Sequence, residues 1–379
     1  MIRHFPGFKS DRPVVVVTSD EPWGHVWHTQ LHFAYSLSES FNVVFVGPPS
    51  KWTLRSLFSP KIILEDISST LKVISYSNPI PSLLGKWSVR INDWFNGLMI
   101  SNLAKGCRVE LVWHFDRYRS VFFFRSPSVK HIYHVIDPVA NLNFDRYLSV
   151  NADLVVSVSR RYLDHYKGLN RNVAYEGQGW DPSLLAKASE SSVSQNLNHG
   201  SMLLLGTFLD DVDYELLIQL RSEIKGVPMV LIGPDRTRLP ERRSLFLQLC
   251  GLPEVFWLGA LPPVEYLQHI AASAVCLIAY EPTGKVFNRI RVFGTPLKVM
   301  SYLGCHKPVV SSIDCEIPEL ANIAIHEASS HIEFIEKVRG CLTGGLVFEG
   351  QQVEAYLNKV TYGSIISRLL LKIGVNPQS

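Results

Sequence analysis

The stretch from Ala279 to Ser312, AYEPTGKVFNRIRVFGTPLKVMSYLGCHKPVVSS, decides how we interpret the second half of this 379-residue chain. It predicts the end of a buried strand, a basic loop, a helix, and a second buried strand from Pro308 to Ser311. Thr295 suits the N-cap of the helix, because its hydroxyl can accept a hydrogen bond from a free amide of the first turn. Pro296 suits the first helical position, where no N–H is needed.

Cations gather around the start of this helix. Lys298 lies in the first turn, where the helix dipole opposes a positive charge. Lys285, Arg289 and Arg291 precede it closely. A bound anion would explain this accumulation, and phosphate is the usual one. A solvated basic loop beside an ordinary helix is an equally good explanation from the spacing alone.

Length and composition limit the number of domains and the class of protein. The chain exceeds one typical hydrophobic core, which predicts two domains. An apolar fraction of 46% with 19% charged residues is typical of a well-packed globular protein. The net charge of +3 is too small to indicate nucleic-acid binding, but it is compatible with anionic substrates or an anionic membrane surface. The six cysteines form no C-x-x-C pair, which indicates reduced structural thiols in a cytosolic protein.

We expect a cytoplasmic protein whose membrane contact, if it has one, is peripheral at the inner face. The N-terminal MIRHFPGFKSDRP has no apolar core of signal-peptide length, and no run of about 18 apolar residues occurs. The stretch from Leu83 to Leu103 places Trp87, Ile91 and Trp94 at helical spacing, with cations nearby. Such a stripe is most often a core face, which is what we expect; an interfacial membrane helix is the alternative.

Apolar strands and helical segments alternate throughout. The four-valine run Val14–Val17 is typical of a parallel strand buried on both faces, and a helix near 29–39 and a strand at Asn42–Val46 complete a βαβ unit. The pattern predicts an α/β fold with two doubly wound, Rossmann-like parallel sheets. Further strands are expected at 62–64, 71–75, 109–113, 130–133, 154–157, 173–175, 202–205, 229–232, 255–258 and 275–279. Helices are expected at 86–104, 141–150, 160–167, 214–224, 242–250 and 264–272, and a terminal helical region at 351–372.

The polar, serine-rich segment 181–200 predicts a linker between the two sheets. We therefore expect an N-terminal domain over residues 1–180, a second domain over 201–348, and a helical region over 349–379 that packs back on the first domain. Ligands of such sheets bind at the carboxyl ends of the strands, here in the cleft between the domains.

Several polar residues or glycines follow predicted strands. His114 ends one strand, and His134 ends the next, with Asp137 three residues later. Histidine transfers protons near neutral pH and a carboxylate can orient it, so these are candidate catalytic residues; a structural role is as frequent. Gly206-Thr207 and Gly233 end two later strands, where glycine lets a ligand approach the backbone, although a plain turn needs glycine equally.

Absent motifs narrow the class. The chain has no G-x-G-x-x-G, Walker A, G-x-S-x-G or H-E-x-x-H motif. This disfavours a dinucleotide dehydrogenase, a P-loop enzyme, a serine hydrolase and a zinc protease. No aspartate-rich D-x-D motif follows a strand in a convincing place, so we expect neither a metal nor a cofactor.

Segments along nearly the whole chain match one family. The segment 23–49 is similar to W-D-x-x-W-Q-R-P-Q-x-L-A followed by a strand ending in P-P, and 152–159 looks like A-D-L-V-x-x-x-S. The most specific match joins Asn288 to 296–310, which is similar to N-x7-P-L-K-L-x-E-Y-L-A-A-G-K-P-V-V. On these motifs the chain resembles the retaining, family-4-type glycosyltransferases of the GT-B fold, and more narrowly the bacterial teichuronic-acid and exopolysaccharide group.

The resemblance implies transfer of a hexose from a nucleotide diphosphate sugar to a hydroxyl, with retention, in cell-surface polysaccharide or glycoconjugate synthesis. It assigns Lys298 and the helix start to the diphosphate and places His134 close to the histidine that contacts the donor sugar; Asp137 matches an acid often found there. Cationic side chains such as Arg289 or Arg291 would replace a metal. The partners implied are a nucleotide sugar and a saccharide or lipid-linked saccharide acceptor.

Two positions depart from the family pattern. Ser301 replaces the glutamate that holds the ribose hydroxyls, and Thr295 replaces an asparagine. A serine cannot make the charge-assisted bidentate contact of a carboxylate. This keeps open a GT-B scaffold that has lost catalysis and serves as a binding partner. A nucleotide-sugar epimerase shares the fold, but the P-L-K segment argues against it.

Overall fold

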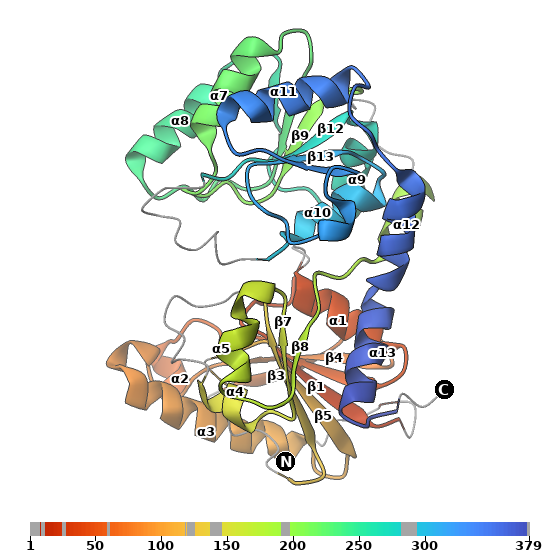
Figure 1. Ribbon diagram of the computed structural model, residues 1–379. Helices are drawn as coiled ribbons and strands as arrows, with labels where there is room; N and C mark the ends of the chain where they lie inside the picture. The colour runs from red at the N-terminus through yellow and green to blue at the C-terminus, as the bar shows by residue number, and fades with distance from the viewer. Residues whose placement is uncertain are drawn as a thin grey trace. The chain divides into compact units, whose positions relative to one another are not determined.

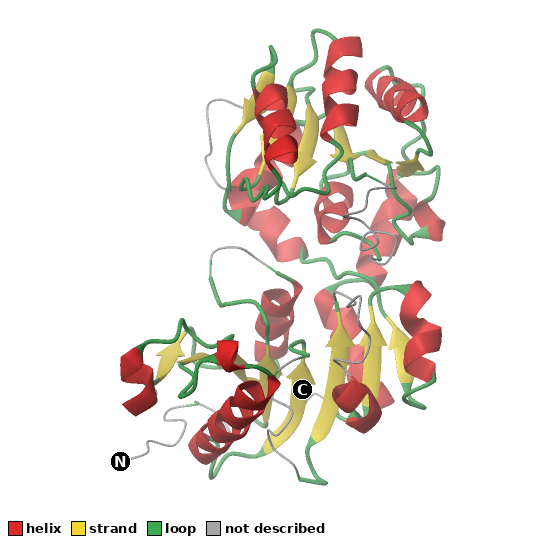
Figure 2. Cartoon of the chain, turned by 90° about the vertical axis from the view of Figure 1, so that its left-hand side faces the viewer, coloured by secondary structure: helices red, strands yellow, loops and turns green. Residues whose placement is uncertain are grey.

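The computed structural model describes residues 8, 12–24, 28–58, 61–117, 119, 126–136, 146–190, 198–281 and 294–376. The chain divides into two compact units (Figure 1). Unit 1 comprises Met1–Glu176 and Tyr362–Ser379, and unit 2 comprises Gly177–Thr361. Each unit is built on a largely parallel sheet covered by helices (Figure 2), which confirms the predicted fold class.

Unit 1 contains an eight-stranded sheet in the order β3-β4-β2-β1-β5-β6-β7-β8. Every pair is parallel except β3 and β4, which are antiparallel because only four residues connect them. The predicted parallel sheet thus carries one antiparallel strand at its edge. The strands are β1 (Val14–Thr18), β2 (Asn42–Val46), β3 (Ile62–Asp66), β4 (Leu71–Tyr76), β5 (Val109–His114), β6 (Lys130–Val135), β7 (Leu154–Ser157) and β8 (Val173–Tyr175).

The last helix of the chain belongs to unit 1. Helix α13 (Tyr362–Lys372) packs beside α1 (Thr29–Ser38), as Figure 1 shows. The Tyr362 ring stacks on His32 at 4.7 Å between centroids, and Arg368 forms two hydrogen bonds of 2.7 and 3.1 Å with Glu176. The other helices of unit 1 are α2 (Leu54–Phe58), α3 (Lys86–Leu103), α4 (Arg146–Asn151) and α5 (Leu163–Lys167), with short 3-10 turns η1 (Ser82–Leu84) and η2 (Arg160–Tyr162).

Unit 2 contains a six-stranded sheet, parallel throughout, in the order β11-β10-β9-β12-β13-β14. Its strands are β9 (Met202–Leu205), β10 (Met229–Ile232), β11 (Val255–Trp257), β12 (Val275–Ile278), β13 (Val309–Ser311) and β14 (Ile325–Glu327). Its helices are α6 (Pro182–Glu190), α7 (Tyr214–Glu223), α8 (Pro240–Cys250), α9 (Pro263–Ala272), α10 (Leu297–Gly304), α11 (His331–Leu342) and α12 (Gly350–Lys359), with the 3-10 turn η3 (Pro318–Leu320).

Three segments differ from the sequence-based expectation. The expected linker begins with helix α6, whose Leu184 and Ala188 are buried and whose Ala188 carbonyl accepts a hydrogen bond from Gln268 of α9 at 2.8 Å. Two apolar residues four apart are too few to give a periodic pattern in a serine-rich context. The expected helical region 351–372 is helical, and it is divided between α12 in unit 2 and α13 in unit 1. Strand β14 and helix α11 were not predicted at all.

The apolar stripe of α3 is exposed, so our expectation that it forms a core face is wrong. Trp87 and Trp94 are 54% and 55% exposed, while Asn92 and Asn96 on the same helix are buried. Across the described residues, no helix is both long and apolar enough to cross a membrane.

Candidate functional site

The strand order of unit 2 reverses between β9 and β12. In open parallel sheets, ligands bind outside the carboxyl ends of the strands at such a reversal. Strands β9 and β12 pair over only two residues. Beyond this pairing the buried hydroxyl of Tyr302, on α10, accepts a hydrogen bond from Leu205 N at 2.8 Å and donates to Leu277 O at 3.3 Å. Tyr302 therefore fixes α10 to both strands where they diverge.

Two glycines lie in the turns that follow β9 and β10, next to the strand-order reversal. Gly206 follows β9 and donates its amide to Ile232 O, while Gly233 follows β10 and donates to Gly259 O. Gly233 has φ 139°, and a Cβ there would lie 1.8 Å from the Gly206 carbonyl oxygen. Gly206 has φ 145°. A side chain at Gly233 would force the two turns apart, so the bare backbone at this edge is required by packing.

The side chain of Lys298 lies beside Gly206. Its Nζ lies 4.6 Å from the centroid of the Tyr280 ring, and a Cβ on Gly206 would be 3.0 Å from the same nitrogen. Tyr280 lies two residues beyond the end of β12, and Gly206 directly follows β9, so the lysine lies near the ends of both strands. Within the described residues, no carboxylate lies within ion-pair distance of this ammonium group. A cation that stacks on an aromatic ring and lacks a carboxylate in this part of the chain is suited to an anionic ligand.

The start of α10 differs from the prediction. Pro296 is the N-cap residue, without a side-chain cap, and Leu297 is the first helical residue, so the prediction of Thr295 as N-cap is wrong. The Thr295 hydroxyl is buried and donates instead to the Cys315 carbonyl. In the described part of the chain, the amides of Leu297 and Lys298 donate to no acceptor. Two free amides and a lysine at a helix start are complementary to phosphate.

The remaining predicted residues of this half divide into three groups. Thr207 is half-buried beside Gly206. Ser301 forms a hydrogen bond with Tyr266; burial raises the pKa of that tyrosine to about 12, and the bond to Ser301 partly offsets the rise. Asn288, Arg289 and Arg291 lie in 282–293, outside the described residues.

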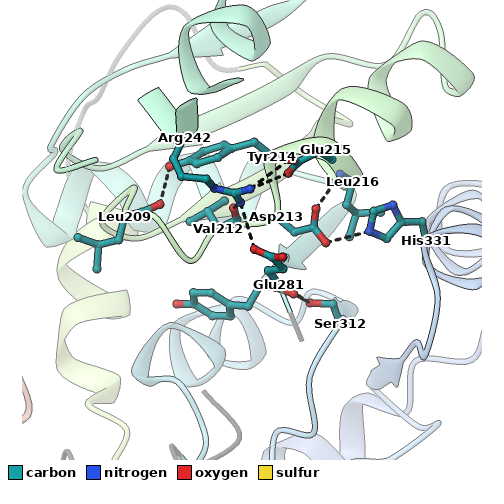
Figure 3. A network of polar contacts seen from close by, with 11 residues as sticks. Leu209, Val212, Asp213, Tyr214, Glu215, Leu216, Arg242, Glu281, Ser312 and His331 are labelled. Atoms are coloured by element: carbon teal, nitrogen blue, oxygen red, sulfur yellow. Dashed lines mark hydrogen bonds and ion pairs between the residues drawn. The ribbon is translucent and has the colours of Figure 1, made fainter. Parts of the chain in front are cut away.

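Figure 3 shows polar contacts of Ser312, Glu281 and Arg242, which lie next to Tyr280 in the structure or the sequence. Ser312 Oγ accepts a hydrogen bond from Tyr280 N at 2.8 Å and donates to Tyr280 O at 2.7 Å. The next residue, Glu281, lies 3.7 Å from Arg242, whose Nη1 also donates to both carboxylate oxygens of Glu215, at 3.0 and 3.1 Å. The backbone that presents Tyr280 to Lys298 is thus fixed on both sides. The network also includes Asp213, Leu216 and His331.

In unit 1, the structure does not bring His114 and His134 together. The His134 ring packs against Phe33 and Phe115, with centroids 5.1 Å away in both cases, and next to Trp113. The ring of His114 instead stacks on His131. Successive strand residues point to opposite faces of a sheet, so Trp113 and His114 belong to different faces. Asp137 lies in 137–145, outside the described residues.

Both histidines are neutral near pH 7. Burial lowers the pKa of His134 to about 3, and burial with the neighbouring His131 lowers that of His114 to about 3. Trp113 Nε1 donates to His134 Nδ1 at 3.3 Å, which places the ring proton on Nε2. That buried Nε2–H has no hydrogen-bond acceptor within the described ranges. At neutral pH His134 is therefore a hydrogen-bond donor, and our expectation of a proton-transferring histidine does not suit this environment.

Sequence reasoning gave no role to Tyr280 or Tyr302. The position of Tyr280 directly after a buried strand was the available signal, since strand ends carry the other candidate residues. Tyr302 looked like one more apolar position of an amphipathic helix, and nothing in the sequence shows its hydroxyl shared between two strands. Across the described residues, no group of three His, Cys, Asp or Glu side chains could hold a metal ion.

The two sheets and their connections define the GT-B fold class, which solved glycosyltransferases share. No protein-family model matches the sequence, and no curated protein matches it. Among solved structures, the one described as trehalose-6-phosphate from E. coli bound with UDP-2-fluoro glucose matches with a TM-score of 0.69 at 12% identity, covering 96% of this chain and 100% of that chain.

Two further structures show the same architecture. Sucrose-phosphate synthase from Thermosynechococcus elongatus matches with a TM-score of 0.67 at 14% identity, covering 96% of this chain and 99% of its own. HepE from Anabaena, in complex with UDP and glucose, matches with a TM-score of 0.62 at 14% identity, covering 94% and 99%. Identities this low establish the fold alone.

Proposed function

We propose that this protein is a glycosyltransferase that moves a hexose from a nucleotide diphosphate sugar to an acceptor hydroxyl. One observation carries the proposal: at the strand-order reversal of unit 2, the ammonium group of Lys298, a residue of the first turn of α10, lies beside Gly206 and over the Tyr280 ring. HepE, which has this fold, is solved with UDP and glucose, and the E. coli structure holds UDP-2-fluoro glucose. Their ligands support a nucleotide sugar here.

The chemistry follows from the charge that develops on the leaving group. The acceptor oxygen bonds to the anomeric carbon, and the bond from that carbon to the diphosphate breaks with its electron pair on the phosphate oxygen. The acceptor proton ends on the released diphosphate or in solvent. Lys298 and the α10 amides stabilise the new negative charge, because fixed donors need no reorganisation during the reaction. In this proposal Arg289 and Arg291 add to that role, and no metal is required.

His134 contributes a neutral donor rather than an acid. Its buried Nε2–H is oriented by the hydrogen bond from Trp113 to Nδ1, and we assign it to a saccharide hydroxyl. Asp137 belongs to the same proposed group. The sequence resemblance extends the proposal to retention of configuration, to a cytoplasmic enzyme, and to a saccharide or lipid-linked saccharide acceptor in cell-surface polysaccharide or glycoconjugate synthesis.

Calorimetric titration with UDP, GDP, dTDP and ADP tests the site, followed by assays of nucleotide diphosphate release from the matching hexose donor. We expect Lys298→Ala to weaken nucleotide diphosphate binding roughly 10- to 100-fold, the equivalent of one hydrogen bond to a charged group. Binding of the corresponding nucleoside, which has no phosphate, should change little. Lys225→Ala, which removes an exposed cation of the same unit, is the matched control. Equal nucleotide affinity in wild type and Lys298→Ala would refute the assignment.

A binding scaffold without catalysis is the second candidate, and Ser301 favours it. The Ser301 hydroxyl is engaged by Tyr266 at the position where the resemblance places a ribose-binding carboxylate. Nucleotide binding that depends on Lys298, without donor turnover in the presence of any acceptor tested, would select the scaffold. An epimerase would instead convert the donor to a second nucleotide sugar without releasing the nucleotide.

A further inference from the structure

Helix α3 exposes a stripe of apolar side chains that an ordinary surface helix would bury. Its outer face carries Trp87, Ile91, Trp94 and Leu98, which are 54%, 45%, 55% and 47% exposed and recur at helical spacing. Surface helices usually bury their apolar stripe and expose their polar one. Here the buried face is polar over most of its length, with Ser88, Asn92, Asp93 and Asn96, and it becomes apolar only towards the end of the helix, at Ile100.

Specific hydrogen bonds hold α3 in this orientation. Asn92 pairs with both backbone groups of Ile80, donating to its carbonyl at 2.7 Å and accepting from its amide at 3.0 Å. Asn96 donates to Asn78 at 2.9 Å, and Ser88 donates to Gly85 O at 2.8 Å. Rotating α3 to bury its tryptophans would break the bonds of Asn92 to Ile80 and of Asn96 to Asn78, whereas the bond from Ser88 to Gly85 lies within the first turn of the helix. The outward apolar face is therefore a feature of the fold.

Further exposed apolar residues lie in two elements that precede α3 in the chain, α2 and η1. In η1, Leu83 is 98% exposed, and in α2, Leu54 and Phe58 are 73% and 85% exposed. Trp52 Nε1 donates to Pro79 O at 3.2 Å, which ties the segment before α2 to the loop that carries η1. Figures 1 and 2 show α2 and α3 near each other in unit 1. We call this set the α2–α3 surface: Leu54, Leu57, Phe58, Leu83, Leu84, Trp87, Ile91, Trp94 and Leu98.

A cationic pocket borders the α2–α3 surface. It has a volume of about 220 Å³, and Arg55 of α2 lines it together with Lys51 and Lys61. Hydroxyl groups of Ser50 and Thr53 also line it, and its lining includes no acidic residue. Among the described residues, none of these three cations forms an ion pair. Three unpaired cations and several hydroxyls around a small pocket are complementary to a phosphate group.

We propose that the α2–α3 surface docks on an anionic lipid bilayer, with a lipid phosphate in the Lys51–Arg55–Lys61 pocket. Tryptophans, leucines and an exposed phenylalanine enter the boundary between headgroups and acyl chains, where an aromatic ring can keep its N–H wet. The adjacent cations face the anionic headgroups, whose attraction adds to the burial of apolar area. Exposed aromatic and aliphatic side chains next to unpaired cations are the composition of a peripheral membrane contact.

Charge favours a bilayer over a second copy of the chain. A two-fold symmetric pairing places the same patch on both partners, so each copy would bring its unpaired cations towards those of the other. Like charges brought together in this way cost affinity. The proposal does not depend on sugar transfer, because it concerns unit 1 and is tested by vesicle binding, whereas nucleotide binding tests unit 2.

Flotation of the full chain with vesicles tests the proposal. Wild type should bind phosphatidylcholine vesicles that contain about a third phosphatidylglycerol, bind pure phosphatidylcholine much more weakly, and dissociate as salt is raised. Trp87→Ser with Trp94→Ser should lower vesicle affinity at least tenfold through lost apolar burial. Arg55→Ala with Lys61→Ala should remove the preference for the anionic vesicles while leaving the weak neutral binding unchanged.

Two matched controls keep the outcome interpretable. Leu371→Ser removes an apolar residue that is 67% exposed on α13, and Lys225→Ala removes an exposed cation of unit 2; both should bind vesicles like wild type. Each variant is checked for wild-type circular dichroism and nucleotide affinity, so misfolding is detected. Failure of wild type to bind anionic vesicles, or retained binding in the double tryptophan variant, overturns the proposal. So does a change from dimer to monomer in that variant, because it would assign the surface to a second copy.

Discussion

Acidification should destabilise unit 1 through His134 and His114. The pKa of each falls from the ordinary 6.5 to about 3 in the folded chain, chiefly because burial disfavours the charged ring. The unfolded chain therefore binds protons below about pH 6.5 that the folded chain does not. The stability conferred by each neutral histidine is complete above that pH and is lost as the pH falls towards about 3.

The magnitude follows from linkage. Between about pH 7 and about pH 5, each histidine binds most of a proton in the unfolded state and almost none in the folded state, which costs about 2 kcal/mol per residue. His134→Phe removes the titrating ring but keeps a ring of similar size among Phe33, Trp113 and Phe115. It loses the acceptor of the Trp113 hydrogen bond, a penalty of about 1–3 kcal/mol that does not vary with pH.

Hydrogen exchange of β5 and β6 is the suitable assay, because it measures the opening free energy of unit 1 separately from unit 2. Over this pH range the wild-type opening free energy should fall by about 2 kcal/mol more than that of His134→Phe. Replacing the exposed His199 by glutamine should leave the wild-type curve unchanged in shape. If wild type and His134→Phe give parallel curves, then His134 takes up its proton in the folded state and the reasoning fails.

Two further substitutions test the strand-order reversal in unit 2. Gly233→Ala should lower the unfolding free energy of this unit by about 1–3 kcal/mol more than Gly226→Ala does. Both glycines have a positive φ, but only a Cβ at Gly233 would collide with the Gly206 carbonyl. Similar thermal midpoints for the two variants would show that the turns separate freely. Tyr302→Phe should cost about 2–4 kcal/mol in the unfolding free energy of unit 2, since it leaves Leu205 N–H and Leu277 C=O unpaired in the core; a cost near that of an exposed tyrosine would mean that water replaces the hydroxyl.

Much of the fold was predictable because it depends on local patterns. The valine run of β1 and the apolar runs of β9 and β12 are long enough to mark buried parallel strands, and short polar segments separate them from helices. The strand-end position of Gly206 and the helix-start position of Lys298 followed from these boundaries. Long-range pairing was not accessible in the same way. The strand at 62–64 was therefore predicted without its antiparallel direction, and the short β14 was not predicted.

The errors share a cause. In each case a polar side chain contacts a residue that is distant in the sequence or that local sequence patterns do not indicate. Periodicity shows that α3 has an apolar face, but the amide pair between Asn92 and Ile80 decides that this face points outward. Thr295 has the chemistry of an N-cap, yet its hydroxyl donates to Cys315, twenty residues later. Likewise, His114 and His134 both end strands, and only the strand register shows that they occupy opposite faces.

Because the last helix of the chain belongs to unit 1, unit 1 cannot finish folding until the ribosome has synthesised all of unit 2. Residues up to Glu176 emerge first, but the helix that covers His32 and Phe33 begins only at Tyr362, after all of unit 2 has been made. While the intervening residues are synthesised, the helix that covers His32 and Phe33 is missing, and this apolar side of unit 1 stays exposed. Nascent chains of this length should therefore recruit chaperones until α13 emerges and Arg368 can reach Glu176.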